Sequence, residues 1–185
     1  MSEEKKILLI DMDQVMVNFY EHPAKHLNIR GKARLADYPW TERNPPEMYE
    51  KGFWENLLPL EGAKEAIKEL SKYYDVWICS QPVATHPASY SGKVKWIDAH
   101  YPDLVKKVIF TQDKALIYGD YLIDDNDDWL KTFTVGKPIK FNDREPANSW
   151  RVITKMLIKE AKNETQTESM EQGRETTEGT GGSGN

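Results

Sequence analysis

Short apolar runs recur along the chain, and each is bounded by polar or turn-forming residues. Runs of this length, rich in Ile, Val and Leu, are too short for a typical helix and indicate buried strands. They comprise residues 7–10, 76–79, 108–111, 121–123 and 138–141. We therefore predict five strands.

Helical periodicity appears between several of these runs. Residues 63–73 and 93–100 place apolar side chains at spacings of three and four, and a further segment of this kind begins at about Ser149. Strands that alternate with helices predict an α/β fold. We expect a Rossmann-like open parallel sheet of about five strands, covered by helices on both faces.

The interval between the first and second strands is too long for an ordinary connection. It is rich in aromatic and proline residues, and long segments of this kind commonly form lids or binding loops. We predict a small helical cap, residues 18–59, inserted after the first strand. The core domain would then consist of residues 1–17 and 60–162.

The last part of the chain, residues 163–185, contains one large apolar residue, Met170. Because it cannot bury enough surface to offset the entropy of ordering, we expect a disordered acidic tail. Its five glutamates and single arginine account for most of the net charge of −5. The remaining chain is close to neutral, which argues against binding of a nucleic acid polymer, since that requires clustered basic residues.

Cellular location is also constrained by composition. Cys79 is the only cysteine, so an intrachain disulfide is excluded and a reducing, cytoplasmic environment is favoured. No secretory signal precedes the first strand, and no apolar stretch approaches the roughly 20 residues that cross a bilayer. We expect a soluble protein without a membrane partner, and the sequence leaves a homodimer open.

Two of the apolar runs end in paired carboxylates. Asp11 and Asp13 follow the first run, and Asp124 and Asp125 follow the fourth. Parallel strands place ligands beyond their carboxyl ends, so the two pairs are expected to converge. Adjacent buried carboxylates are costly unless neutralised, and oxygen ligands favour Mg²⁺. These four residues therefore form a predicted magnesium site.

The acidic residues also have purely structural explanations. Asp11 and Asp13 fit an Asp-rich turn after a strand. The cluster from Asp124 to Asp128 fits the acidic first turn of a helix, an explanation that suits Asp127 and Asp128 better than the two acids before them.

The second and third strands end in other groups that can bind an anion. Ser80 and Gln81 follow the second strand, and Lys114 lies three residues beyond Thr111. A hydroxyl and an ammonium group at this end of the sheet could hold a phosphate. Ser80 fits an ordinary turn equally well. Lys93 is a weaker candidate, because a solvated helix residue is its simplest interpretation.

The strand ends carry a family resemblance. The segments DMDQVMVNF (11–19), ICSQP (78–82), TQDK (111–114) and LIDD (122–125) resemble the four motifs of the haloacid dehalogenase superfamily of phosphatases. Within it, the chain is most similar to the 5'(3')-deoxyribonucleotidase family, and GFWENLLPLEGA at 52–63 belongs to the similar region. This resemblance covers about residues 6–155.

The resemblance implies a haloacid dehalogenase-like fold and a Mg²⁺-dependent phosphomonoesterase acting on deoxyribonucleoside monophosphates. Asp11 would attack phosphorus to form an aspartyl-phosphate, and Asp13 would protonate the leaving group and then activate water. Mg²⁺ would be held by Asp11, the backbone carbonyl of Asp13 and Asp125, with Asp124 in support. The transferring phosphoryl group would be held by Ser80 and Lys114, with help from Lys93.

Three aromatic residues, Phe19, Phe53 and Trp54, resemble the pocket that stacks on a nucleobase. Packing between cap and core is the alternative explanation for Phe53 and Trp54.

The first and second motifs also depart from the family pattern. Gln14 stands where the family usually has Gly, Asn18 replaces a common Asp, and Gln81 is a further change near the phosphate. Because of these departures, two alternatives stay open. One is a phosphatase of another small phosphomonoester, such as a sugar phosphate. The other is a non-catalytic nucleotide-binding or regulatory protein on the same scaffold.

Overall fold

The computed structural model describes residues 5–19 and 52–178. Most of the predicted cap, residues 20–51, lies outside the described residues. The two ends of that interval meet in an antiparallel ribbon, in which β2 (Val17–Asn18) pairs with β3 (Leu58–Pro59). The chain therefore leaves and re-enters the core at one place, as an inserted segment requires.

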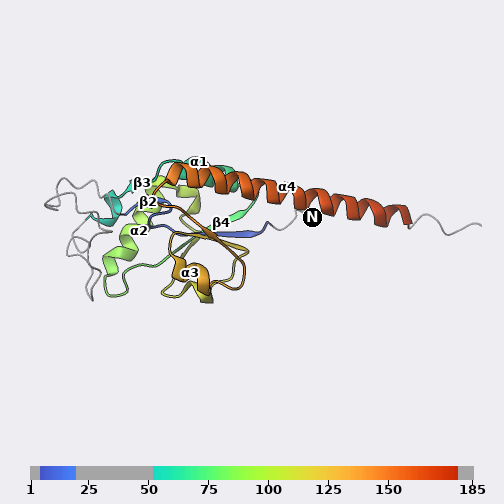
Figure 1. The fold of residues 1–185 in the computed structure, drawn as a ribbon. Coiled ribbons are helices and arrows are strands. Elements are labelled where there is room, and N and C mark those ends of the chain that lie inside the picture. Colours follow the sequence, from blue (N-terminus) through green and yellow to red (C-terminus); the bar gives the residue numbers. More distant parts are fainter. Residues whose placement is uncertain (1–4, 20–51, 179–185) are drawn as a thin grey trace, which may run out of the picture.

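The centre of the fold is a five-stranded sheet in the order β5-β4-β1-β6-β7 (Figure 1). Each neighbouring pair is parallel, which confirms the predicted α/β open sheet. The predicted strands all form, with small changes at their ends. They are β1 (Ile7–Ile10), β4 (Asp75–Ser80), β5 (Val108–Phe110), β6 (Tyr121–Asp124) and β7 (Lys137–Lys140).

Helices cover both faces of this sheet. On one face lie α1 (Ala63–Leu70), α2 (Pro87–His100) and α4 (Pro146–Glu178), and on the other lies α3 (Asp127–Thr132) (Figure 1). Successive side chains of β1 point to opposite faces of the sheet. Leu8 and Ile10 join the larger apolar cluster, which includes Trp96 of α2. Leu9 joins the smaller cluster on the other face, which includes Phe133. A buried central strand of this kind explains the unbroken apolar run at residues 7–10.

Helices α2 and α3 differ from the sequence-based expectation in where they begin. Helix α2 begins at Pro87, six residues before the predicted start, and Pro is well suited to a first helical position. Its first turns are polar, so apolar periodicity did not reveal them. Helix α3 was foreseen only as an alternative. Its N-cap is Asn126, whose side chain accepts a hydrogen bond from the Asp128 backbone N–H at 2.8 Å.

The predicted disorder from residue 163 is wrong for residues 163–178, which continue helix α4. Extending an existing helix needs no new nucleation, and the Glu, Gln, Met and Arg residues of this segment are good helix formers. Glu164 also forms an ion pair with Lys6 at 2.5 Å, which ties the helix to the chain just before β1. The helix then runs beyond the sheet (Figure 1). The end of the predicted tail, residues 179–185, lies outside the described residues.

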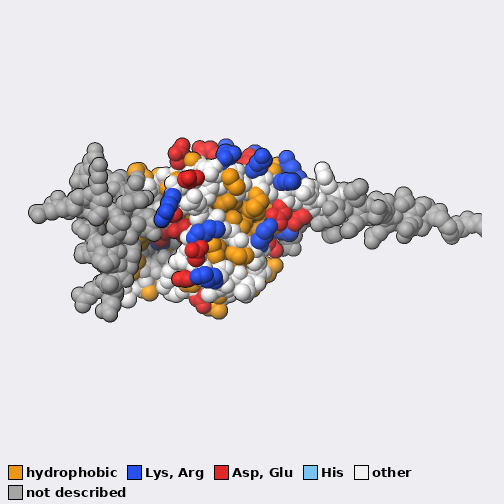
Figure 2. Space-filling view, viewed as in Figure 1, with side chains coloured by type: hydrophobic (Ala, Val, Ile, Leu, Met, Phe, Trp, Pro, Cys, Tyr) orange, Lys and Arg blue, Asp and Glu red, His pale blue; other side chains and the backbone are white. Residues whose placement is uncertain are grey.

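The surface charge agrees with the near-neutral net charge predicted for the chain without its acidic tail. On the face shown in Figure 2, basic and acidic side chains are interspersed rather than segregated. In the part of the chain that the structure describes, we find no helix with the length and apolar character needed to cross a bilayer.

Candidate active site

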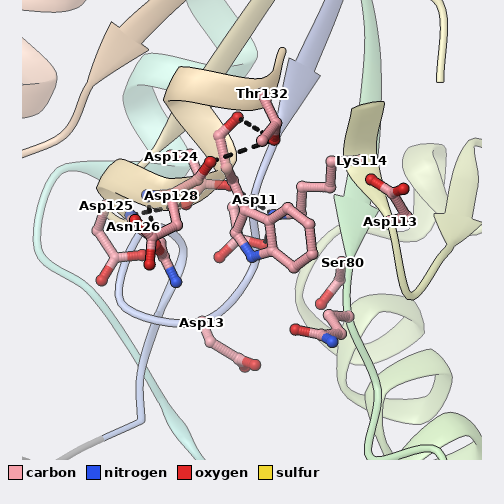
Figure 3. Close-up of polar contacts among 12 residues, drawn as sticks. Asp11, Asp13, Ser80, Asp113, Lys114, Asp124, Asp125, Asn126, Asp128 and Thr132 are labelled. Carbon is pink, nitrogen blue, oxygen red and sulfur yellow. Dashed lines mark hydrogen bonds and ion pairs between the residues drawn. The ribbon is translucent and has the colours of Figure 1, made fainter. Parts of the chain in front are cut away.

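The predicted site residues meet at the carboxyl end of the sheet. Strand β1 lies between β4 and β6, so Asp11 follows the central strand while Ser80 and Asp124 end its two neighbours. The Asp11 backbone N–H donates to the Ile123 carbonyl at 2.9 Å, which continues the ladder up to the site. Figure 3 shows Asp11 between Asp124 and Asp125 on one side and Lys114 and Ser80 on the other.

Lys114 is the cation at the centre of this group. Its side chain is 1% exposed, and its Nζ lies 2.5 Å from Asp11 Oδ1 and 2.5 Å from Asp124 Oδ2. Burial alone would lower the pKa of this amine, but the two carboxylates outweigh burial and raise it, so Lys114 stays charged. It begins the 3-10 helix η5 (Lys114–Leu116), whose N-cap Asp113 accepts from the Ala115 N–H at 2.9 Å.

The carboxylates of Asp11, Asp124 and Asp125 form a cluster that could hold a metal ion. One oxygen from each lies within 4.8 Å of the others. Burial, reinforced by the neighbouring carboxylates, raises the pKa of Asp124 to about 6 and that of Asp125 to about 8. Lys140 does not relieve Asp125, because its Nζ contacts the Asp125 backbone carbonyl at 2.5 Å instead. This all-oxygen set, short of positive charge, fits a hard divalent cation.

Lys93 places a second buried ammonium group in the site, beside Asp13. Its Nζ lies 2.5 Å from Asp13 Oδ2, 2.8 Å from Ser80 Oγ and 3.3 Å from the Gln81 carbonyl. The interpretation of Lys93 as a solvated residue is wrong, since its side chain is fully buried. The missed signal is its spacing from Ser89 and Trp96 on the buried face of α2, which becomes visible once the helix starts at Pro87.

Asp13 lies at the open side of the site. Burial raises the pKa of its carboxyl and Asp11 adds to this effect, while Lys93 opposes it. Its Oδ1 is buried and has no hydrogen-bond partner among the residues that the structure describes. Burial and Asp11 thus make the Asp13 carboxyl a weaker acid than a free Asp, which is the direction that suits a group that donates a proton.

The departures from the family pattern have clear structural settings. Gln14 is buried and adopts φ +57°, a left-handed conformation that favours Gly, which explains the usual glycine at this position. The Gln81 side chain is exposed, and its Nε2 donates to Gln112 Oε1 at 3.1 Å.

Asp127 and Asp128 lie in the first turn of α3, so the helix-terminus explanation holds for these two acids.

The three aromatic residues of the predicted base pocket pack on one another. The ring of Trp54 lies 5.7 Å from that of Phe19 and 5.1 Å from that of Phe53, and all three side chains are buried. Trp54 also lies against Gly92 of α2 in the core domain, so packing between the inserted segment and the core, the alternative explanation, is present in the structure. Contact with a nucleobase stays a prediction.

The charges of the site do not balance by themselves. Four carboxylates, those of Asp11, Asp13, Asp124 and Asp125, face the two ammonium groups of Lys93 and Lys114. With all six groups ionised the site would repel a phosphate dianion, and a bound divalent cation removes the excess. The arrangement is thus suited to an anionic substrate that binds together with a metal ion.

Comparison with known proteins identifies the family of the chain. A family model described as "5' nucleotidase, deoxy (Pyrimidine), cytosolic type C protein" matches residues 5–163. A Staphylococcus aureus (strain Mu50) protein named "Putative 5'(3')-deoxyribonucleotidase" is 30% identical over 175 residues, which cover 83% of this chain and 96% of that protein. The human cytosolic-type 5'(3')-deoxyribonucleotidase is 37% identical over 142 residues, covering 65% of this chain and 70% of the human protein.

Among solved structures, a "putative haloacid dehalogenase-like hydrolase" from Burkholderia xenovorans LB400 is similar at a TM-score of 0.48 and 12% identity, covering 78% of this chain and 85% of that one. The family match spans every strand of the sheet and every residue of the carboxylate and lysine group. The chain therefore belongs to the 5'(3')-deoxyribonucleotidase family and is a phosphoric monoester hydrolase.

Proposed function

We propose that the protein is a Mg²⁺-dependent phosphomonoesterase that hydrolyses (deoxy)ribonucleoside monophosphates through an aspartyl-phosphate on Asp11. The observation that carries this proposal is the position of Asp11, between a buried lysine and two further carboxylates at the end of the central strand (Figure 3). Family membership supports the substrate class. A cytoplasmic location belongs to the same proposal and is favoured by the single, buried Cys79.

Asp11 is the proposed nucleophile and Asp13 the proposed acid and base. An Asp11 oxygen forms a bond to phosphorus while the ester P–O bond breaks, and the leaving oxygen takes the proton of the Asp13 carboxyl. Asp13, now ionised, accepts a proton from water, and that water attacks phosphorus. The bond between phosphorus and Asp11 then breaks and phosphate is released, so both carboxyls return to their starting states.

The remaining groups would bind the phosphoryl group and the metal. Ser80, Lys93 and Lys114 would donate hydrogen bonds to phosphoryl oxygens, since their donor atoms converge beside Asp11 and Asp13. Mg²⁺ would be held by Asp11, Asp125 and the backbone carbonyl of Asp13, with Asp124 in support. When bound, the metal supplies positive charge that offsets both the carboxylates and the phosphate.

A panel of deoxyribonucleoside monophosphates and sugar phosphates tests this function, assayed in Mg²⁺ and in EDTA. We expect phosphate release only in Mg²⁺, with the highest kcat/KM on the nucleotides. Release of phosphate in EDTA at the same rate would contradict the role of the metal. A higher kcat/KM on a sugar phosphate would contradict the substrate class and leave the chemistry in place.

A further inference from the structure

The segment that returns from the insert is held tightly against helix α2. This segment contains the 3-10 helix η3 (Trp54–Asn56), and Trp54 lies directly on Gly92 of α2. A Cβ atom added at Gly92 would overlap the Cβ of Trp54, so only glycine permits this approach. One turn further along α2, the Trp96 Nε1–H donates to the Leu57 carbonyl at 2.7 Å.

The same turn of α2 carries Lys93 into the active site. The Lys93 ammonium lies 5.2 Å from the centroid of the Trp54 ring and also contacts Asp13 and Ser80. Trp54 therefore forms one wall around a fully buried lysine, and the proposed acid and phosphate-binding groups form the other. An aromatic face attracts a desolvated ammonium group, and Trp is the strongest of the aromatic side chains in this respect.

We propose that Trp54 is a positioning residue for the reaction. Seated on Gly92, its ring holds the Lys93 ammonium against Asp13 and Ser80, so that docking of the returning segment on α2 completes the phosphate end of the site. This inference rests on the proposed function. It differs from base stacking because the effect of Trp54 would reach every phosphomonoester, including one without a base.

The surroundings of Trp54 support a role inside the protein. Its side chain is 2% exposed and is enclosed by Phe19, Phe53 and Lys93. The face of the ring toward Lys93 contacts the ammonium group, so this role of Trp54 needs no ligand. Long lysine side chains have several rotamers, so removing one wall leaves the ammonium free to leave its place between Asp13 and Ser80.

The experiment compares Trp54→Leu with Trp54→Phe in the full chain with Mg²⁺, using a deoxyribonucleoside monophosphate and glycerol phosphate, which has no base. We expect Trp54→Leu to lower kcat by about tenfold on both substrates, and Trp54→Phe to restore most of it by keeping an aromatic face. Val94→Ala, a neighbouring α2 residue that is 37% exposed, is the matched control and should leave both rates unchanged. A loss confined to kcat/KM for the nucleotide would overturn the proposal.

Gly92→Ala provides a second, independent variant, because it displaces Trp54 without changing it. We expect the same loss on both substrates, and little further loss when Gly92→Ala is combined with Trp54→Leu. Circular dichroism and Tm establish that each variant is folded. If the fold-losses in rate of the two single variants multiply in the double variant, the two residues act independently, and a shared action through Lys93 is contradicted.

Binding of inorganic phosphate in Mg²⁺, measured by calorimetry, separates this inference from the proposed function. If the wild type hydrolyses neither substrate, the proposed function fails, but the positioning role still predicts weaker phosphate binding by Trp54→Leu. Equal phosphate affinity in the wild type and Trp54→Leu would overturn the positioning role whatever the catalytic result.

Discussion

At the amino end of the sheet, where the strands begin, acidic and basic side chains neutralise one another in contact with water. Around Asp11, at the carboxyl end, they are largely buried and unequal in number. The ion pairs at the amino end keep at least 30% of each side chain exposed and comprise Lys6–Glu164, Lys107–Asp75 and Lys137–Glu160. At the carboxyl end, Lys93 and Lys114 are essentially buried and face four carboxylates.

This difference separates charges that serve the fold from charges that serve the reaction. Exposed pairs contribute little to stability because water competes for both partners. Buried charges that lack a partner are costly, and a protein retains them where a ligand supplies what is missing. The acidic excess beside Asp11 therefore marks the place where we expect the proposed metal and phosphate to bind, and the balanced charges of the amino end offer no such place among the described residues.

Replacing Asp11 should have the largest effect on activity. Asp11→Asn removes the proposed nucleophile, and we expect kcat to fall by about 10⁴-fold or more. Asp127→Asn makes the same chemical change at an exposed acid of the α3 first turn and should leave kcat unaltered. Steady-state kinetics on one nucleotide compares the two. Equal rates for Asp11→Asn and the wild type would remove Asp11 from the mechanism.

Removing a lysine should cost far more at the carboxyl end than at the amino end. Lys114→Met leaves Asp11 and Asp124 buried without their cation, and we expect a loss of about 3–5 kcal/mol in the free energy of unfolding. Lys107→Met breaks a pair in which Lys107 is 41% exposed, and should cost under about 1 kcal/mol. Urea denaturation measures both values in EDTA. Similar losses of stability in the two variants would contradict the difference between the buried charges of the carboxyl end and the exposed pairs of the amino end.

Stability should depend on pH in a direction set by Asp124 and Asp125. Burial raises the pKa of these groups to about 6 and about 8, above the value of about 4 for an unfolded Asp. Between those values the folded state binds more protons than the unfolded state, so the free energy of unfolding falls as pH rises. At the proposed metal site, Mg²⁺ would replace these protons.

We therefore expect Mg²⁺ to raise Tm more at about pH 8 than at about pH 6. Thermal denaturation in EDTA and in Mg²⁺ at the two pH values gives the difference directly. A rise in Tm that is equal at both pH values would show that these carboxyls do not bind the ion.

The smallest effect should come from the ion pair that holds helix α4. Glu164→Gln removes the contact with Lys6, and both side chains are about two-fifths exposed. We expect the free energy of unfolding to fall by about 0.5 kcal/mol and kcat/KM to stay the same. Urea denaturation and kinetics on the same preparation test both parts. A change in kcat/KM would mean that this ion pair at the amino end of the sheet affects catalysis at the carboxyl end.

Much of the sheet could be predicted because strands buried on both faces are visible as short apolar runs. The acids at the end of the first and fourth runs could be placed together for a similar reason, since parallel strands share one carboxyl end. The contacts of Lys114 with Asp11 and Asp124 are seen only in the structure, although all three residues are predicted to lie at this end of the sheet.

Other features depend on contacts between distant segments and were therefore hidden. Lys93 is buried because Trp54 and Asp13 enclose it, and neither lies near it in sequence. Gln14 has φ +57°, a conformation that its residue type does not suggest. The helical extension to Glu178 is not evident from the sequence, because a composition with a single large apolar residue argues against order. Helix propensity and the helix that precedes the segment favour it.

The most direct test of the central claim is a rapid acid quench of the wild-type enzyme with a nucleotide radiolabelled in its phosphate. If Asp11 is the nucleophile, we expect a label on the protein that appears only with Mg²⁺ and maps to the peptide containing Asp11. The label should be absent in Asp11→Asn. A label on another residue, or full turnover in EDTA, would contradict it.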